Sequence, residues 1–381
     1  MDICDAMEST SRACPLCSAE KFEILSQRLD EGLTQRGIYL FNVVEGVCQD
    51  CGFIYTNPVP TDKSLISYYG DKYLHSVGSP DYDIEKRIAY LKRVAGGRKR
   101  LLEAGSGEGS FLSRAREIGF DAKGIEPNVE VQARKLAVGM ISRKQKYEII
   151  VAAHVLEHIE RPLDWLKKLY ASLIDRGLLI LEVPNLHLYG KYTTGVFYEH
   201  LSHFSPEHLA YLVNQAGFQL LGFEHDDVSR PQGFTILAER REKVDSVRLA
   251  RQYELNKRFY GHALKLIDER NAISRVFIND MIAQCEGGVL AVWGANLIML
   301  KLLRMVSAGC LARIILVDEN DRRWNDLLCS DIPLSIVSPE CLRLNTSVKR
   351  IVICAIGWAH QIRESLQQMG YSRDQIRLAP V

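Results

Sequence analysis

Alternating glycines near the middle of the chain have a spacing that suits ligand binding. The glycines of residues 105–109 follow a short apolar segment that ends at Glu103, and apolar residues then recur at helical spacing over residues 111–118. Glycines between a strand and a helix let the backbone approach a ligand without a Cβ clash, and the helix start offers unpaired N–H groups. The next expected strand ends at Glu126, whose carboxylate can accept hydrogen bonds from both hydroxyls of a ribose. The pattern indicates a nucleotide site. The alternative is an α/β domain whose glycines only allow a tight turn.

Four of the ten cysteines form two Cys-x-x-Cys pairs, Cys14 with Cys17 and Cys48 with Cys51. Two such pairs, each able to form a knuckle, are typical of a tetrahedral site in which four thiolates hold a structural zinc ion. The alternative is a redox-active pair, which more often stands alone beside a strand–helix motif. We expect the other six cysteines to be ordinary thiols.

A loop rich in histidine and aromatic side chains spans residues 197–205 and follows an expected strand at residues 178–183. We therefore expect it to lie over the carboxyl ends of the strands, where open α/β sheets bind ligands. Glu199 stands directly before His200. Such a pair can supply a base of near-neutral pKa and a group that orients it. The alternative is that this segment only packs and caps the following helix. We expect His203 and His208 to be structural rather than catalytic.

Composition excludes several classes of protein. Lys and Arg number 48 against 47 Asp and Glu, a net charge of +1, so we expect no nucleic-acid partner. The first residues are acidic and lack the apolar core of a signal peptide, and no apolar run reaches about 18 residues. We therefore expect a cytoplasmic protein with no membrane contact.

Changes in composition and in the pattern of apolar residues along the chain predict five parts. We expect a zinc-binding module at residues 1–60 with a strand at 41–44, a helical lead-in and substrate loop at 61–95, an α/β domain at 96–240, one or two amphipathic connecting helices at 241–286, and a smaller Rossmann-like α/β domain at 287–381. Within the larger α/β domain we expect helices at 162–173 and 206–217 and strands at 218–225 and 234–239. The last domain lacks the full glycine fingerprint in its first turn, so we expect no second nucleotide cofactor.

Four segments in order resemble the class I S-adenosylmethionine (SAM) methyltransferases: residues 103–109, 124–127, 146–159 and 178–185. The resemblance implies a Rossmann-like fold with SAM as cofactor. It also implies a set of cofactor-binding residues: Glu103, Gly105, Gly107, Glu126 and His154. Little room remains between Glu126 and Tyr147 for a full third strand, which only residues 138–142 could form. No Asp follows that segment to hold the adenine amino group.

The order of cysteine pairs, SAM domain, Glu-His loop and C-terminal α/β domain is similar to that of sugar C-methyltransferases. These enzymes act at C3 of nucleotide-linked 4-keto-6-deoxy sugars. The resemblance implies a small-molecule substrate, with His200 as the base, Glu199 as its partner and Tyr73 as a candidate to reprotonate from the opposite face. Phe197 stands where the family usually has Tyr. Two alternatives remain open: O- or N-methylation of a sugar or another small cell-envelope metabolite, and a binding protein that has lost activity.

Overall fold

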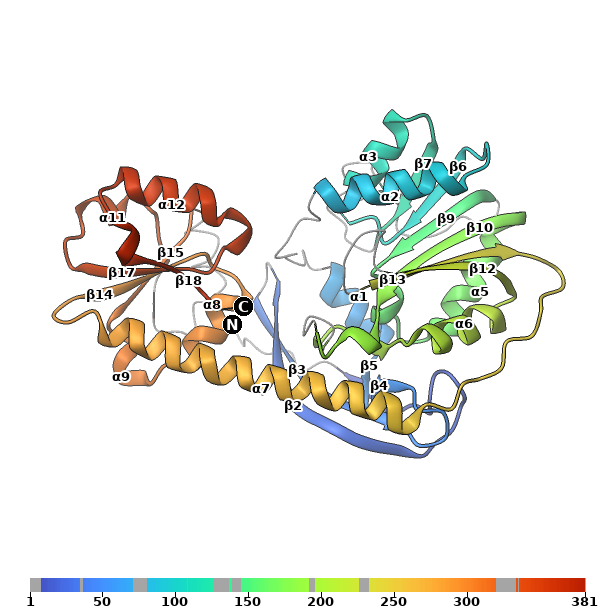
Figure 1. Ribbon diagram of the computed structural model, residues 1–381, viewed down its shortest axis with the longest axis horizontal. Coiled ribbons are helices and arrows are strands. Elements are labelled where there is room, and N and C mark those ends of the chain that lie inside the picture. The colour runs from blue at the N-terminus through green and yellow to red at the C-terminus, as the bar shows by residue number, and fades with distance from the viewer. Residues whose placement is uncertain are drawn as a thin grey trace.

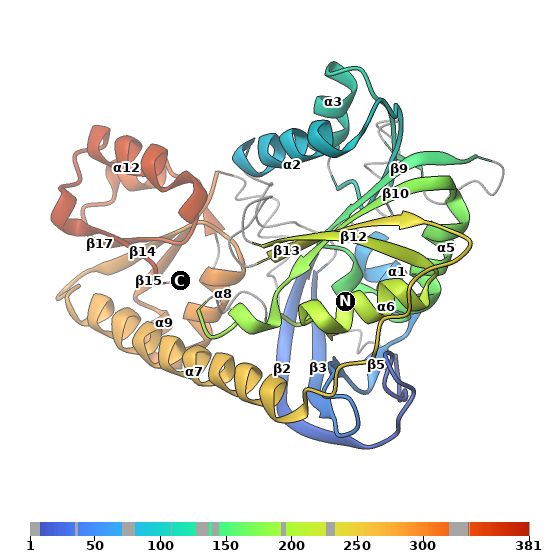
Figure 2. The same ribbon diagram turned by 45° about the vertical axis from the view of Figure 1, so that its right-hand side comes forward.

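A computed structural model describes residues 8–34, 37–70, 81–107, 109–126, 137–138, 145–191, 196–225, 233–319, 334 and 336–380. Figure 1 shows two α/β lobes, with the long helix α7 (Tyr253–Ala283) running along one side of both. Strands from the N-terminal part of the chain pack against α7 beneath the larger lobe (Figure 2). No helix in the described ranges is long and apolar enough to be a membrane span.

The larger lobe contains a seven-stranded sheet. Its strands are β6 (Arg100–Ala104), β7 (Asp121–Ile125), β8 (Ala137–Val138), β9 (Tyr147–Ala153), β10 (Leu173–Pro184), β12 (Phe218–His225) and β13 (Gly233–Arg240), in the spatial order β12-β13-β10-β9-β6-β7-β8. Strands β6 to β10 run parallel, whereas β13 is antiparallel to both of its neighbours. The winding reverses between β6 and β9. Open α/β sheets bind ligands outside the carboxyl ends of the strands at such a switch point.

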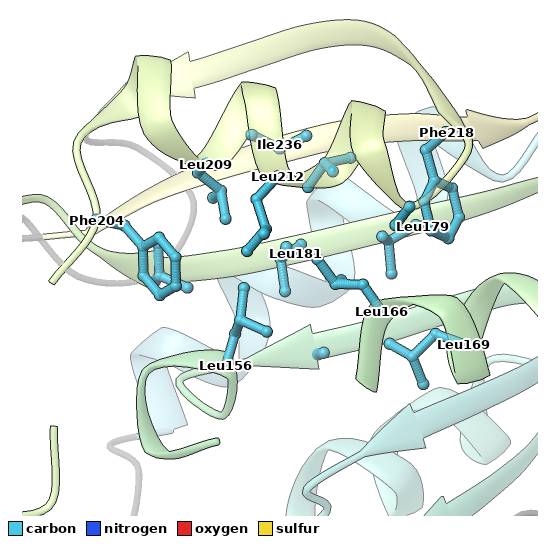
Figure 3. Close-up of a cluster of buried hydrophobic side chains, with 14 of the residues drawn as sticks. Leu156, Leu166, Leu169, Leu179, Leu181, Phe204, Leu209, Leu212, Phe218 and Ile236 are labelled. Carbon is cyan, nitrogen blue, oxygen red and sulfur yellow. The ribbon is translucent and has the colours of Figure 1, made fainter. Parts of the chain in front are cut away.

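Helices cover both faces of this sheet. On one face α2 (Asp81–Val94) and α3 (Ser110–Glu117) enclose an apolar cluster with β6, β7 and β9. On the other, α5 (Pro162–Ser172) and α6 (Pro206–Gln215) turn leucines toward β10 and β13 (Figure 3). The helices and the last two strands lie within a few residues of their predicted positions. In the described part of the chain the third strand, β8, has two residues, in keeping with the little room that the sequence leaves for it.

The N-terminal part is more extended than the sequence predicted. The strand expected at residues 41–44 is the middle of β3 (Gly37–Cys48), which forms a long hairpin with β2 (Phe22–Thr34). Strand β4 (Ile54–Thr56) pairs with β3, and β11 (Ser202–His203) pairs with β4. The Glu-His loop of the larger lobe is thus joined to the N-terminal sheet. Two short strands, β1 (Ser9–Thr10) and β5 (Val59–Pro60), pair beside it, and α1 (Asp62–Gly70) follows.

The smaller lobe contains a five-stranded parallel sheet in the order β16-β15-β14-β17-β18. Its elements are β14 (Val289–Trp293), α8 (Leu297–Arg304), α9 (Ala308–Leu311), β15 (Ile314–Val317), β16 (Ile336–Val337), α11 (Cys341–Leu344), β17 (Val348–Ile353), α12 (Ala359–Gln368) and β18 (Ile376–Leu378). The connection expected to contain one or two helices has the single helix α7, preceded by an irregular segment at residues 241–252.

Candidate active site

The glycine turn after β6 brings the backbone close to the neighbouring loop. Gly105 has φ 78°, and a Cβ atom on it would lie 2.2 Å from a methyl group of Val155. Its N–H donates to the carbonyl of Ile125 at the end of β7 (2.8 Å). The N–H of Gly107, two residues further along the same turn, donates to Glu126 Oε2 (2.9 Å). The carboxylate of Glu126 therefore lies next to the glycine turn.

Glu103 is a buried acid at the end of β6, with 6% of its surface exposed. Its Oε2 accepts no hydrogen bond from the described part of the chain. Burial raises the pKa of Glu103 to about 8, a shift that Arg87 opposes and Glu126 reinforces. Buried polar atoms almost always have a partner in native proteins, so this carboxyl group suits a ligand that brings a hydrogen-bond donor.

His154, directly after β9, links the sheet to the following loop. It has the unusual φ of 55°, and its backbone N–H donates to the carbonyl of Glu182 (2.9 Å). Its ring nitrogens lie 3.0 Å from Glu182 Oε1 and 3.3 Å from Glu157 Oε1, while Arg87 Nε donates to Glu182 Oε2 (3.4 Å). Burial alone would lower the pKa of His154, but the two carboxylates raise it. Positive and negative groups thus alternate along the carboxyl ends of β9 and β10.

The short 3₁₀ helix η1 (Leu156–His158) and the Glu-His loop meet next to His154. His158 Nδ1 lies 3.0 Å from the backbone oxygen of Glu199, and the rings of His158 and His200 pack edge to face with centroids 4.9 Å apart. Glu157, His158 and His200 together place three candidate ligand atoms within 4.8 Å of one another. The predicted base is therefore buried beside a histidine and a carboxylate of η1.

A cluster of aromatic side chains lies next to Glu199. The Tyr68 hydroxyl, from α1, donates to Glu199 Oε1 (2.7 Å) and lies 2.8 Å from the Tyr198 hydroxyl. Phe41 of β3 packs against both tyrosine rings. Because the hydrogen bond observed at the Glu199 carboxylate comes from Tyr68, the role of Glu199 as partner of His200 stays a prediction.

His203 and His208 contact protein groups through their rings. His203 is fully buried between Glu45 Oε1 (3.2 Å) and the Tyr189 hydroxyl (3.1 Å). Burial alone would raise the pKa of Glu45, but the contact with His203 contributes to holding it at about 2. His208 Nε2 lies 3.1 Å from the backbone oxygen of Cys51. These contacts agree with the structural role expected for both histidines.

The four paired cysteines converge at one point. The distance between sulfur atoms is 3.7 Å for Cys14 and Cys51 and 3.6 Å for Cys17 and Cys48, and all four lie within 4.8 Å of one another. Four Zn–S bonds of about 2.3 Å in a tetrahedron separate their sulfurs by about 3.8 Å. The cluster therefore has the dimensions of a Cys4 zinc site.

Each cysteine pair forms the expected knuckle. Ser18 and Gly52, the residues directly after the pairs, both have positive φ (63° and 82°). The second knuckle is also an anchor point for later parts of the chain, because the Cys51 carbonyl accepts from the Gln252 N–H at the start of α7 (3.0 Å). The same carbonyl contacts His208 of α6. The cysteine cluster thus joins elements from three regions of the sequence.

The structure brings together the predicted cofactor residues Glu103, Gly105, Gly107, Glu126 and His154 at the carboxyl ends of β6, β7 and β9. Tyr73 lies outside the described residues. Sequence reasoning missed three residues of the site: Arg87, Glu157 and Tyr68. Glu157 stands in the conspicuous segment after β9 and could have been singled out there. Nothing in the sequence around Arg87 or Tyr68 distinguishes them from other helix residues.

Residues 79–222 match a family model described as a methyltransferase domain. No curated protein matches the chain. Similar solved structures include a SAM-dependent methyltransferase from Archaeoglobus fulgidus (20% identity, 41% of this chain and 94% of that chain, TM-score 0.35). The CcbJ methyltransferase from Streptomyces caelestis is another (16% identity, 46% and 98%, TM-score 0.36). A third is magnesium protoporphyrin IX methyltransferase from Synechocystis PCC 6803 with bound SAH (18% identity, 42% and 82%, TM-score 0.33).

The family match and the fold, rather than these distant likenesses, identify the central domain. The matched residues include β6 to β10 with the glycine turn, the acid after β7 and the histidine after β9. The protein is therefore a SAM-dependent methyltransferase whose central domain has the class I α/β fold.

Proposed function

We propose that the protein methylates a carbon of a nucleotide-linked keto-deoxysugar, with His200 as the base. The observation that carries this proposal is the burial of His200 against His158, in a loop attached to the turn that also bears the cofactor residue His154. A base for the substrate and the residues expected at the methyl donor thus belong to one connected group. The class of substrate is supported by the resemblance of the whole domain order to the sugar C-methyltransferases.

The chemistry suits this arrangement. A proton on the carbon next to a ketone is acidic enough for an imidazole to remove. SAM, when bound, supplies an electrophilic methyl group. In the proposed reaction His200 would take the C3 proton, so that the enolate carbon could accept the methyl group that bound SAM would supply, with the carbon–sulfur bonding electrons remaining on the departing sulfur. His200 then releases its proton to solvent.

The proposed cofactor site lies at the carboxyl ends of the strands. Glu126 would accept the two ribose hydroxyls, and the turn at Gly105 and Gly107 would let the methionine portion pass close to the backbone. Glu103, buried and with one oxygen unpaired in the described chain, would accept a hydrogen bond from the ammonium group of the same portion. His154 would lie between this site and the substrate loop.

The structural zinc proposed at Cys14, Cys17, Cys48 and Cys51 is supported by the sulfur distances and the two knuckles. With four thiolate ligands the ion has no open position for a substrate, so its role would be to hold α6, α7 and the N-terminal sheet together. Metal analysis of purified protein should give about one zinc per chain from this site. Folded protein that contains no metal would contradict the proposal.

The role of His200 can be tested with His200→Asn. The variant should keep its affinity for SAM and for the sugar but turn over about 10²–10⁴ times more slowly, the usual contribution of a positioned base. It should also lose the exchange of the C3 proton with deuterated water that the wild type performs when SAM is replaced by its demethylated product. The matched control is His360→Asn, which changes an exposed histidine on α12 of the smaller lobe.

The same experiment separates C-methylation from the alternatives. A wild-type enzyme that methylates a hydroxyl or amine, and exchanges no proton on any 4-keto sugar, would overturn the proposal. Carbon NMR of the product locates the new methyl group.

A further inference from the structure

Glu157, His158 and His200 bring a carboxylate and two imidazoles together where η1 meets the Glu-His loop. Their candidate ligand atoms lie within 4.8 Å of one another, and Glu157 and His200 are buried. We propose that these three side chains form a binding site for a divalent first-row transition-metal cation, separate from the Cys4 cluster.

The first argument is the state of Glu157. Only 1% of its surface is exposed, yet neither carboxylate oxygen accepts a hydrogen bond from the residues that the structure describes. Its nearest charged neighbour is His154, whose Nδ1 lies 3.3 Å from Oε1. A buried carboxylate is costly unless it is hydrogen-bonded, paired or bound to a metal. His154 pairs with Oε1, whereas Oε2 has no hydrogen-bond partner among the described residues, so a cation at Oε2 would offset the remaining cost of burial.

The second argument is the orientation of His158. A backbone carbonyl can only accept, so the contact of His158 Nδ1 with the Glu199 oxygen requires the proton to be on Nδ1. In the neutral ring Nε2 is then an acceptor, and it faces Glu157 Oε1 at 3.9 Å. With Nδ1 held by the Glu199 carbonyl, Nε2 is the ring nitrogen directed at the Glu157 carboxylate. A carbonyl that fixes the tautomer of a histidine in this way is the usual outer partner of a metal-binding imidazole.

The third argument is the type and spacing of the ligands. Two imidazoles and a carboxylate suit Zn²⁺, Co²⁺ and related ions, and leave further positions for water or substrate. Bonds of about 2.0–2.2 Å place two ligands of one ion at most about 4.4 Å apart, so small rotations of the three side chains complete the site. His154, which pairs with Glu182, also pairs with Glu157 Oε1 and can orient that carboxylate.

An ion at this site would interfere with the reaction proposed above. A nitrogen of His200 that coordinates a metal has no lone pair left for the substrate proton. A bound ion should therefore inhibit turnover, a consequence that rests on the proposed function whereas the site itself does not.

The test is titration of zinc-loaded protein with Co²⁺, because the visible absorption of Co²⁺ reports its coordination. We expect one further equivalent of Co²⁺ per chain while zinc stays on the cysteines, as metal analysis would show. Glu157→Gln and His158→Gln should each weaken Co²⁺ binding by at least about 100-fold, since even outer partners of a metal contribute about 10–100-fold. His360→Asn, which disrupts an exposed His-Glu pair, is the control.

Zinc-loaded wild type that takes up no further Co²⁺ would overturn the site, as would unchanged Co²⁺ affinity in both variants. Because His158 is more exposed than Glu157, its variant keeps the test decisive if Glu157→Gln does not fold. Co²⁺ that binds without slowing turnover would support the site and would instead count against His200 as the base.

Discussion

The two lobes contain closely similar turns that differ in what occupies the helix start. In each lobe the first strand ends in a glycine turn, and an acid after the next strand accepts a backbone N–H from that turn. Gly107 donates to Glu126 in the larger lobe (2.9 Å), and Ala295 donates to Asp318 in the smaller one (2.8 Å). Both turns lie where the winding of a parallel sheet reverses, the position at which such sheets bind ligands.

The smaller lobe fills this position with its own side chains. Asn296 caps α8 by accepting from the Ile298 and Met299 N–H groups, and its amide donates across the switch point to the Cys354 carbonyl. In the larger lobe the residue before α3 is Gly109, and no side chain of the described residues caps that helix. Glu103, one residue before the end of β6, corresponds to the apolar Val292 in β14. A strand–turn–helix unit is thus a candidate ligand site when no side chain caps the helix start and the acid in the strand has an oxygen that a ligand could contact.

The largest expected difference in SAM affinity comes from replacing the corresponding acid of each turn with alanine. Glu126→Ala should weaken SAM binding by about 10²–10⁴-fold, because two hydrogen bonds to a charged acceptor contribute about 1.5–3 kcal/mol each. Asp318→Ala should leave SAM affinity unchanged. Calorimetric titration of both variants with SAM measures the difference. Equal effects of the two substitutions would show that the lobes do not differ in the way described.

A smaller effect is expected from the strand acid of the larger lobe. The pKa of Glu103 is about 8 in the fold against an ordinary 4.5, so the folded state holds the proton more tightly than the unfolded state. Wild type should therefore lose stability relative to Glu103→Gln as pH rises from about 4.5 to about 8, by at most about 3–5 kcal/mol. Denaturant unfolding of both proteins at several pH values tests this. Parallel stability curves would show that Glu103 has no raised pKa.

Local patterns in the sequence predicted most elements of both lobes. The spacing of apolar residues predicted the strand at residues 218–225 and the helix starting at Pro206, because that pattern depends only on neighbouring residues. The long hairpin of β2 and β3 was missed, since its polar and glycine-containing strands are fixed by pairing and by contact with α7. The Cys4 cluster, by contrast, could be predicted, because the spacing of its two Cys-x-x-Cys pairs is visible in the sequence.

The group around Glu157 has no comparable spacing signal. Glu157 and His158 lie far along the chain from His200, and they meet because the Leu201 N–H donates to the Glu157 carbonyl and His158 contacts the Glu199 carbonyl. Tyr68 reaches Glu199 from α1 by the same folding of distant segments. The sequence could therefore predict which loops carry the candidate site, but not which side chains of those loops would touch.

The smallest effect is expected from reopening the helix start of the smaller lobe. Asn296→Ala removes the cap of α8 and the hydrogen bond to Cys354, and should cost about 0.5–2 kcal/mol of local stability. Faster hydrogen exchange confined to residues 289–306 would report that loss, and SAM affinity should not change. Asn296→Asp, which keeps the capping oxygen and loses only the amide donor, should fall between wild type and Asn296→Ala. A loss of SAM affinity in Asn296→Ala as large as that in Glu126→Ala would contradict this prediction. It would mean that the turn of the smaller lobe belongs to the cofactor site. The two turns would then not differ in whether a ligand or a side chain occupies the helix start.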